Sequence, residues 1–378
     1  MSPAPQNRNL SIDFLRIISM YAICVCHLIA HGGLICSDAS QLQNISLTFL
    51  KFATLWHVNC FALASGYIYI SKEFKLNRIF KIWGLTLFYS VILTGIMMIF
   101  YPDTVSWKSL FVSFFPLATN QYWYVTAYAQ MFLLIPVFNV ALRKTSEGDI
   151  AKLLQILALL FCVLSLIPKL GRNFNVTIIK NGYSPVWLSY LYCIGGYWKL
   201  YGLTSLFKNG YFEHIKMPDA AFHMTKSAKT QFFLFCSLVV LASLLKISFN
   251  SSSLSARLEA YTCPLIFVNA LIVMNMCLSH SFIRIERYIC FLAPLAFSVY
   301  LIHDNNWIRE LLIQRASIII DCFPPLLCVP AVLLAGFALF SLCAGVDFIR
   351  RNLFLLFKRH TSSFFIRLKQ RFLEKIIF

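Results

Sequence analysis

One apolar segment near the N-terminus holds side chains suited to acid–base chemistry. Arg16 and His27 are eleven residues apart in the stretch SIDFLRIISMYAICVCHLIAH. On an α-helix this spacing makes about three turns, rises roughly 16 Å and returns to within about 20° of the starting direction. Both side chains therefore share one helix face, and Asp13 is placed three residues before Arg16 to pair with it. Because an imidazole exchanges protons near neutral pH, His27 is a candidate general base.

Further histidines are expected at the depth of His27. His31 lies four residues later on the same stripe, while His57 and His303 occur in the apolar stretches WHVNCFALASGYIYI and FSVYLIHDNNW. Histidines that converge from three helices at one level indicate a buried functional site. A metal site is the first alternative, but no Cys or carboxylate accompanies these histidines at ligand spacing, so we predict that no metal is bound.

Basic residues follow the second apolar segment, in the sequence KEFKLNRIFK. Arg78 and Lys81 are three residues apart on one helical face, a spacing that suits the binding of phosphates. Lys and Arg also accumulate in cytoplasmic loops for reasons of membrane topology alone, and that interpretation stays open for this pair.

The other candidates also have purely structural interpretations. Arg16 is placed where an interfacial anchor would reach the headgroups, and His27 would equally serve as a hydrogen-bonded core histidine. Ser65 and Gly66 would permit close helix packing, and Tyr124 would fit an aromatic belt at the membrane boundary. The shared helix face of Arg16 and His27 favours a functional role for these two residues.

The composition places all of these residues in a membrane protein. Apolar residues make up 59% of the 378-residue chain and charged residues 13%, against roughly 45–50% and about 25% in soluble domains. The net charge is +18, but the basic residues lie between apolar segments, so we expect no nucleic acid partner. The thirteen cysteines form no CxxC pair, and most lie in apolar runs that favour packing roles.

Ten apolar segments are candidates for crossing a bilayer, which needs about 20 residues per helix. With the N-terminus in the cytoplasm, 24 of the 33 Lys and Arg residues fall on the inner side, as the positive-inside rule requires. We therefore predict an all-α, polytopic membrane protein with about ten transmembrane helices and with cytoplasmic N- and C-termini. The segments are 11–34, 50–71, 79–101, 122–142, 150–168, 184–203, 230–249, 260–280, 288–308 and 325–348.

Two regions are expected on the membrane surface. The chain divides into a membrane domain over 1–349 and a basic tail over 350–378. The tail alternates basic pairs with Leu, Phe and Ile, which predicts an amphipathic helix on an anionic inner leaflet, with a solvated tail as the alternative. Residues 105–120 are too few to span the bilayer and are expected at its outer interface.

Four sequence motifs, taken in order over residues 8–308, resemble those of the acyltransferase-3 family. Members of this family are integral membrane O-acyltransferases, which mostly acetylate bacterial surface carbohydrates and usually have ten helices. The absence of a further domain after the tenth segment is similar to members found with capsule or O-antigen assembly genes. The motifs are Arg16 with His27, Ser65-Gly66-Tyr67, Trp123-Tyr124 through Pro136, and Ser298 with Tyr300 and His303.

The resemblance implies a donor substrate and residues that would bind it. The donor would be cytoplasmic acetyl-CoA, used by an enzyme in the bacterial plasma (inner) membrane among its lipids. Arg16, Arg78 and Lys81 would meet the CoA phosphates, and Asp13 would orient Arg16. The family has Arg-x-x-Arg where this chain has Arg78 and Lys81, so a clamp of two arginines is not expected here.

The resemblance also implies the roles of the remaining site residues. His27 would act as general base on a sugar hydroxyl, or would carry the acyl group transiently. Ser65, Tyr124 or His303 would support the acyl carbonyl or the acceptor, which would be a surface polysaccharide or its lipid-linked precursor. The alternatives are a transporter of a saccharide or lipid-linked intermediate, and a structural or sensory membrane protein.

Overall fold

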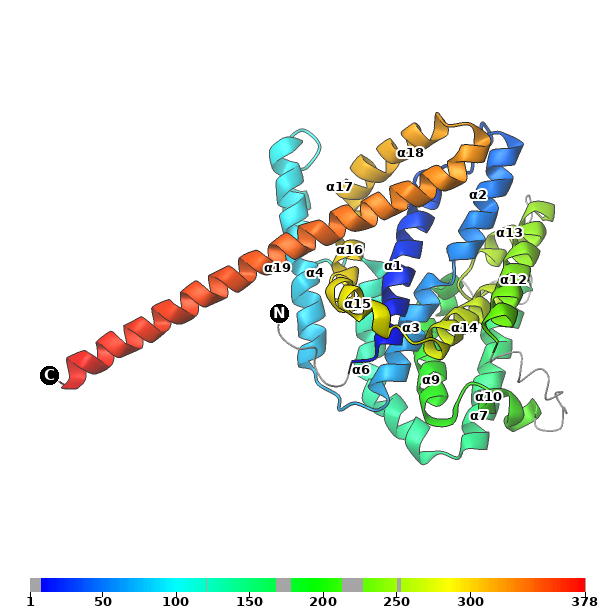
Figure 1. Ribbon diagram of the computed structural model, residues 1–378, viewed down its shortest axis with the longest axis horizontal. Helices are drawn as coiled ribbons and strands as arrows, with labels where there is room; N and C mark the ends of the chain where they lie inside the picture. The colour runs from blue at the N-terminus through cyan, green and yellow to red at the C-terminus, as the bar shows by residue number, and fades with distance from the viewer. Residues whose placement is uncertain (1–7, 120, 168–177, 213–226, 250–252, 378) are drawn as a thin grey trace.

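The computed structural model describes residues 8–119, 121–167, 178–212, 227–249 and 253–377, with side chains as far as residue 356. Every regular element in these ranges is a helix and none is a strand, which confirms the predicted all-α fold (Figure 1). The helices form one bundle, from which the C-terminal helix extends.

Seven helices in the described part of the chain are long and apolar enough to cross a membrane. The number is eight if Pro264–Ser279 and Ile283–Leu292, which are bent by 87° relative to one another, count together as one span. The other predicted segments are also helical, but α9 (Pro185–Tyr201) and α14 (Pro264–Ser279) are shorter, and the ninth is divided into α15 (Glu286–Leu292) and α16 (Ala296–His303). A multi-pass membrane protein follows from these helices, while the count of ten and the orientation stay predictions. The seven are α1 (Leu10–His31), α2 (Gln41–Thr54) with α3 (His57–Tyr69), α4 (Asn77–Phe100), α6 (Trp123–Lys144), α7 (Glu147–Ala158) with its extension to Leu166, α12 (Ala228–Ser248) and α19 (Pro325–Ile377).

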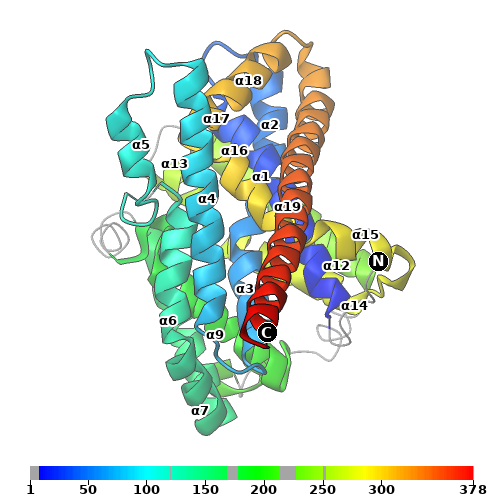
Figure 2. The ribbon, with the colours of Figure 1, turned by 90° about the vertical axis from the view of Figure 1, so that its left-hand side faces the viewer.

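Helix α1 lies at the centre of the bundle. It begins at Leu10 because the Asn9 side chain caps it, accepting a hydrogen bond from the Ile12 amide at 3.1 Å. It then packs against α2, α3, α14, α16 and α19 (Figure 1, Figure 2). The polar face of α1 is therefore directed at other helices and not at lipid, as functional polar residues in membranes require.

Two helix breaks at one level bring polar residues into the core. The first separates α2 from α3 at Leu55 and Trp56, so that His57 starts a helix inside the bundle. The second ends α16 at His303, where the Tyr122 hydroxyl donates to the Leu301 carbonyl at 2.9 Å. Broken helices are a common way to build polar sites within membranes.

Glycines allow α3 and α9 to pack closely against one another. A Cβ added to Gly66 would lie 1.9 Å from the Tyr192 carbonyl oxygen, and one added to Gly195 would lie 2.1 Å from the Leu63 carbonyl oxygen. Both contacts are with main-chain atoms, so side-chain movement would not relieve them. The interpretation of Gly66 as a residue of close helix packing is therefore supported.

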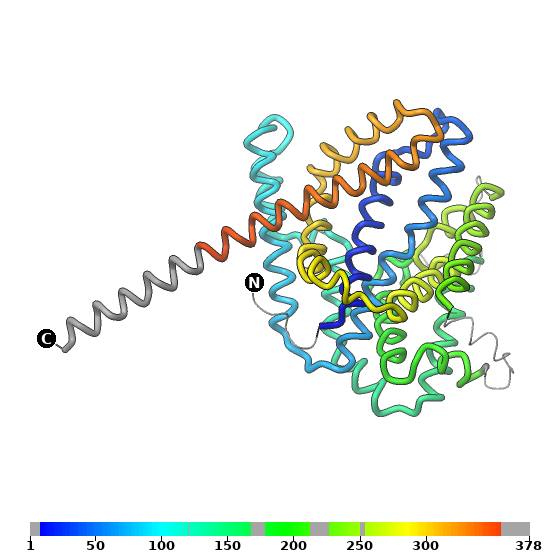
Figure 3. Tube along the Cα trace, viewed as in Figure 1, coloured from blue at the N-terminus to red at the C-terminus, as the bar shows by residue number. Residues whose placement is uncertain are grey.

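Each of the two regions predicted on the membrane surface contains helix. Residues 105–120 contain the short helix α5 (Trp107–Ser113), which is far too short to span a bilayer. At the C-terminus, α19 spans Pro325–Ile377. Its coloured part in Figure 3 already leaves the bundle. The predicted boundary at residue 349 thus falls within one helix, and the placement of either region on the membrane stays a prediction.

Candidate active site

The predicted approach of His27 and His303 is confirmed. Nδ1 of His27 lies 3.1 Å from Nε2 of His303 across the interface of α1 and α16. The same nitrogen of His27 lies 3.6 Å from Oδ1 of Asp304, and Nε2 of His31 lies 3.8 Å from that oxygen. His27 is thus surrounded by one imidazole from α16, one carboxylate and a second imidazole from its own helix.

The hydrogen bonds define which nitrogen of His27 is available as a base. Nδ1 of His303 lies 2.6 Å from the Val299 carbonyl oxygen, which can only accept, so this nitrogen carries a proton. In neutral His303 the Nε2 atom is then an acceptor, and it receives the Nδ1 proton of His27. The lone pair of neutral His27 is consequently on Nε2, which has no protein hydrogen-bond partner within the described residues.

A small chamber adjoins His27. It encloses about 40 Å³, and its walls include the rings of His57, Phe61, Tyr124 and Phe297. His57 is fully buried, and neither of its ring nitrogens has a hydrogen-bond partner among the residues that the structure describes. A buried polar group without a partner costs about 1–3 kcal/mol, so this imidazole is poised to bond to something that enters the chamber.

A second cavity continues from the chamber towards Arg16. It encloses about 220 Å³ and shares the side chains of Phe61, Tyr124 and Phe297 with the chamber. Ser65 lies on its wall and donates a hydrogen bond to the Phe61 carbonyl oxygen at 2.9 Å. The structure therefore places Tyr124 beside both cavities, but places Ser65 along the middle cavity and not at the imidazoles.

A third, wider cavity opens at the N-terminal end of α1. We call this cavity of about 780 Å³ the basic mouth, because Arg8, Arg16, Lys72 and Lys199 line it. It shares Arg16 and Tyr69 with the middle cavity, so the three cavities form one series along α1. The mouth holds more positive than negative charge and suits a ligand with several phosphates.

The residues predicted to bind phosphate are only partly brought together. Asp13 forms an ion pair with Arg8 and lies 3.6 Å from the Arg16 guanidinium, which confirms the predicted pairing on α1. Arg78 lines neither the mouth nor the middle cavity, but its guanidinium lies 4.9 Å from the ring centroid of Tyr69, which lines both. Lys81 is exposed and does not line these cavities.

The sequence did not identify the other cations of the mouth. Lys72 and Lys199 belong to the basic residues that the positive-inside rule assigns to the inner side, and nothing in their local sequence sets them apart from the others. They converge because α9 packs against α3, and the Lys199 ammonium lies 4.9 Å from the ring centroid of Tyr67. This contact depends on the fold and leaves no pattern in the sequence.

The expectation that no carboxylate accompanies the histidines is wrong. A carboxylate does accompany the histidines, since ligand atoms of His27, His31 and Asp304 lie within 4.8 Å of one another. Asp304 also lies 3.5 Å from the Arg309 guanidinium, which competes for its charge. The prediction that no metal is bound therefore loses its original reason and stays a prediction.

Comparison with known proteins identifies a family over most of the chain. Residues 9–346 match the profile described as an acyltransferase domain, Acyl_transf_3. No curated protein and no solved structure matches the chain. The matched range includes every residue described above as lining the chamber and the middle cavity.

Proposed function

Because this chain belongs to the acyltransferase-3 family and is therefore a membrane acyltransferase, we propose that it transfers an acetyl group from acetyl-CoA to a carbohydrate hydroxyl. The acceptor in this proposal is a surface polysaccharide or its lipid-linked precursor, and the enzyme acts in the inner membrane of a bacterium. The observation that carries the proposal is the series of cavities from the basic mouth to His27.

The dimensions of this series suit CoA. The pantetheine arm has about twelve chain atoms, equivalent to about four extended residues, and so spans about 14 Å at roughly 3.5 Å per residue. Arg16 and His27 are separated by roughly 16 Å along α1. With the CoA phosphates at Arg8, Arg16 and Lys72, the arm passes Ser65 and Tyr124 and brings the thioester to the chamber.

The size of the chamber favours acetyl over longer acyl groups. A volume of about 40 Å³ corresponds to roughly three water-sized positions at about 10–15 Å³ each. An acetyl group has three heavy atoms, and every further methylene has to displace the rings of Phe61, Tyr124 or Phe297.

The chemistry proceeds from the protonation states of the histidines. Nε2 of His27 accepts the proton of the acceptor hydroxyl while the hydroxyl oxygen attacks the thioester carbonyl carbon. The new C–O bond forms, the C–S bond breaks, and the CoA thiolate leaves and receives the proton from His27. His303 holds His27 in the required tautomer, and His57 donates a hydrogen bond to the carbonyl oxygen as negative charge develops there.

The test measures ester acetyl groups on the surface polysaccharide by proton NMR. Cells with the wild-type protein, a deletion and His27→Ala are compared at equal protein level, with His280→Ala as a histidine control outside the cavities. Acetyl signals should disappear in the deletion and in His27→Ala while the polymer yield is unchanged. Full acetylation in His27→Ala would refute the mechanism, and loss of surface polymer in the deletion would favour a transporter.

A further inference from the structure

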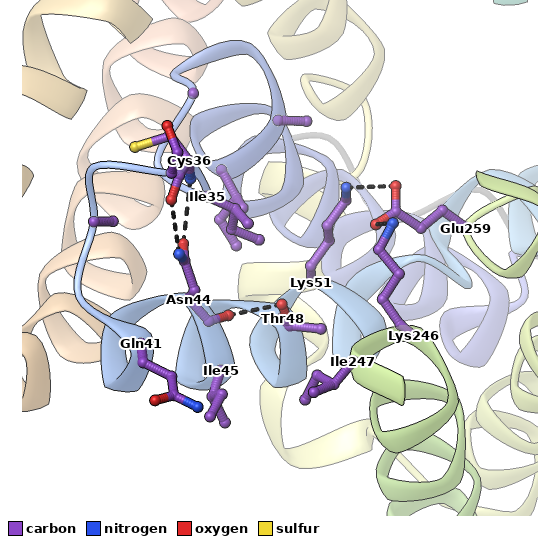
Figure 4. A pocket seen from close by; sticks show the side chains of 15 residues that line it. Ile35, Cys36, Gln41, Asn44, Ile45, Thr48, Lys51, Lys246, Ile247 and Glu259 are labelled. Carbon is purple, nitrogen blue, oxygen red and sulfur yellow. Dashed lines mark hydrogen bonds and ion pairs between the residues drawn. The ribbon is translucent and has the colours of Figure 1, made fainter. Parts of the chain in front are cut away.

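A separate cavity lies at the opposite end of α1 from the basic mouth. It encloses about 780 Å³ between the C-terminal end of α1, the start of α2 and the end of α12 (Figure 4). Its rim is fixed by Asn44, whose amide donates to the Cys36 carbonyl at 2.7 Å and accepts from the Cys36 amide at 3.2 Å. These bonds hold the segment between α1 and α2 in place, so the cavity is preformed.

Three charged side chains lie together on the cavity wall. The ammonium of Lys51 lies 2.8 Å from one oxygen of Glu259, and that of Lys246 lies 3.1 Å from the other oxygen (Figure 4). All three side chains are largely buried, with exposed fractions of 15%, 25% and 19% for Lys51, Glu259 and Lys246. We call these residues the lysine pair and its glutamate.

The cluster carries a surplus positive charge. Burial raises the pKa of Glu259, but the two lysines outweigh this effect and lower the pKa below its usual value, so the carboxylate is ionised at neutral pH. Two ammonium groups share one carboxylate, and each ammonium has three N–H donors. A largely buried surplus charge is costly unless a counter-ion accompanies it.

The cavity is close to the proposed site of transfer. Glu259 precedes Tyr261 by two residues, and the Tyr261 ring lines the chamber, 5.7 Å from the His57 ring centroid. On α2, Lys51 is followed six residues later by His57 at the start of α3. Two short stretches of chain, from Lys51 to His57 and from Glu259 to Tyr261, thus connect the wall of this cavity with the wall of the chamber.

We propose that this cavity binds the acceptor through an anionic group, a carboxylate or a phosphate, that contacts Lys51 and Lys246. The acceptor class is thus a negatively charged saccharide, recognised beside the chamber and away from the CoA mouth. The polar side chains of Gln41, Asn44 and Thr48 on the same wall provide hydrogen-bonding groups for sugar hydroxyls. This inference rests on the proposed function for the identity of its ligand as the acceptor.

Binding of small anions to the purified full chain tests the proposal. D-glucuronate and inorganic phosphate are the probes and D-glucose is the neutral control, at constant ionic strength because salt screens such contacts. Lys246→Ala should weaken the binding of at least one anion about tenfold or more, and Lys51→Ala should act in the same direction. Lys108→Ala on the exposed face of α5 is the matched control and should change nothing.

The substitution Glu259→Gln distinguishes an anion-binding site from a purely structural ion-pair cluster, because the two predict opposite changes in anion affinity. It removes the negative charge from the cluster, so anion binding should become stronger. A purely structural ion-pair cluster would instead lose binding in all three variants, because each would disturb the cavity. Weaker anion binding by Glu259→Gln would overturn the proposal. It would also be overturned if the wild type and Lys246→Ala bound both glucuronate and phosphate with equal affinity.

Two further comparisons separate related explanations. Vesicles that contain phosphatidylglycerol are added as competitor, and displacement of the sugar anion by this lipid at lower concentration would assign the site to a lipid headgroup and overturn the acceptor role. Acetyl transfer from acetyl-CoA is measured separately in the same preparations. Anion binding without any acetyl transfer would refute the proposed function alone, whereas transfer without anion binding would refute this inference alone.

Discussion

Substitution of Phe297 should change which acyl group the enzyme accepts. Its ring forms a wall of both the chamber and the middle cavity, and the chamber itself encloses only about 40 Å³. A pocket that is one methylene too small discriminates by about 1–3 kcal/mol, or roughly 10–200-fold. The wild type should therefore prefer acetyl-CoA over propionyl-CoA by this ratio, and Phe297→Ala should bring the ratio close to one.

Competition between the two donors measures this ratio directly. Membranes that carry the enzyme and its native acceptor receive equal concentrations of acetyl-CoA and propionyl-CoA, and the two esters on the saccharide are quantified by proton NMR. Phe297→Leu, a smaller change with less risk to folding, should give an intermediate ratio, and Phe291→Ala on the exposed part of α15 is the control. Equal use of both donors by the wild type would refute the assignment of the chamber to the acyl group.

Three other substitutions test the hydrogen bonds, the packing and the ion pairs. His303→Phe should lower kcat about 10²-fold with little change in KM for acetyl-CoA. His303→Gln restores an acceptor for the Nδ1 proton of His27 and should therefore recover part of the lost kcat. Equal losses of kcat in both variants would contradict the assigned tautomer of His27. Gly66→Ala should destabilise the protein by about 1–3 kcal/mol in thermal unfolding, because its Cβ meets the α9 main chain, while Gly84→Ala in open space should not. The pKa of Glu259 is lower in the folded protein than its ordinary value of about 4.3. Its charge therefore stabilises the fold at pH values above this ordinary pKa, and the stabilisation is lost as the pH falls through the lowered pKa. The difference in unfolding temperature between the wild type and Glu259→Gln should accordingly shrink below about pH 4, and a constant difference would contradict the charge assignment.

The sequence predicted one helix face of the site and failed on contacts between helices. Arg16, His27 and His31 were placed correctly because the period of an α-helix fixes their relation within one segment. His303 was assigned to the same depth from hydropathy alone, but its bond to His27 depends on the break at the end of α16. Asp304 directly follows His303, but no sequence spacing relates its carboxylate to His27, and only the packing of α1 against α16 brings the two together.

For the fold, too, the positions of helices along the chain were predicted and the breaks within them were not. Apolar runs located each helix, since hydropathy is a local property of the chain. The division into α2 and α3 was not predicted, because no proline or glycine marks the break at Leu55 and Trp56. The division into α15 and α16 was not predicted either, although Pro294 lies between these helices and was a local signal for a break. The end of α16 is likewise set by tertiary contacts, such as the hydrogen bond of Tyr122 to the Leu301 carbonyl, which sequence periodicity does not contain.

His57 differs from His27 and His303 in its hydrogen bonds. His27 and His303 bond to one another, whereas neither ring nitrogen of His57 finds a partner within the described residues, so the protein bears the cost of its desolvation. Replacement by Leu, which is closer to His in volume than Phe is, removes that cost, so His57→Leu should stabilise the protein towards heat by about 1–3 kcal/mol. If His57 donates to the acyl carbonyl, the same variant should lose about 10²-fold or more in acetyl transfer. A residue retained for packing would give the opposite pair of results, lower stability with transfer preserved, and that outcome would remove His57 from the mechanism.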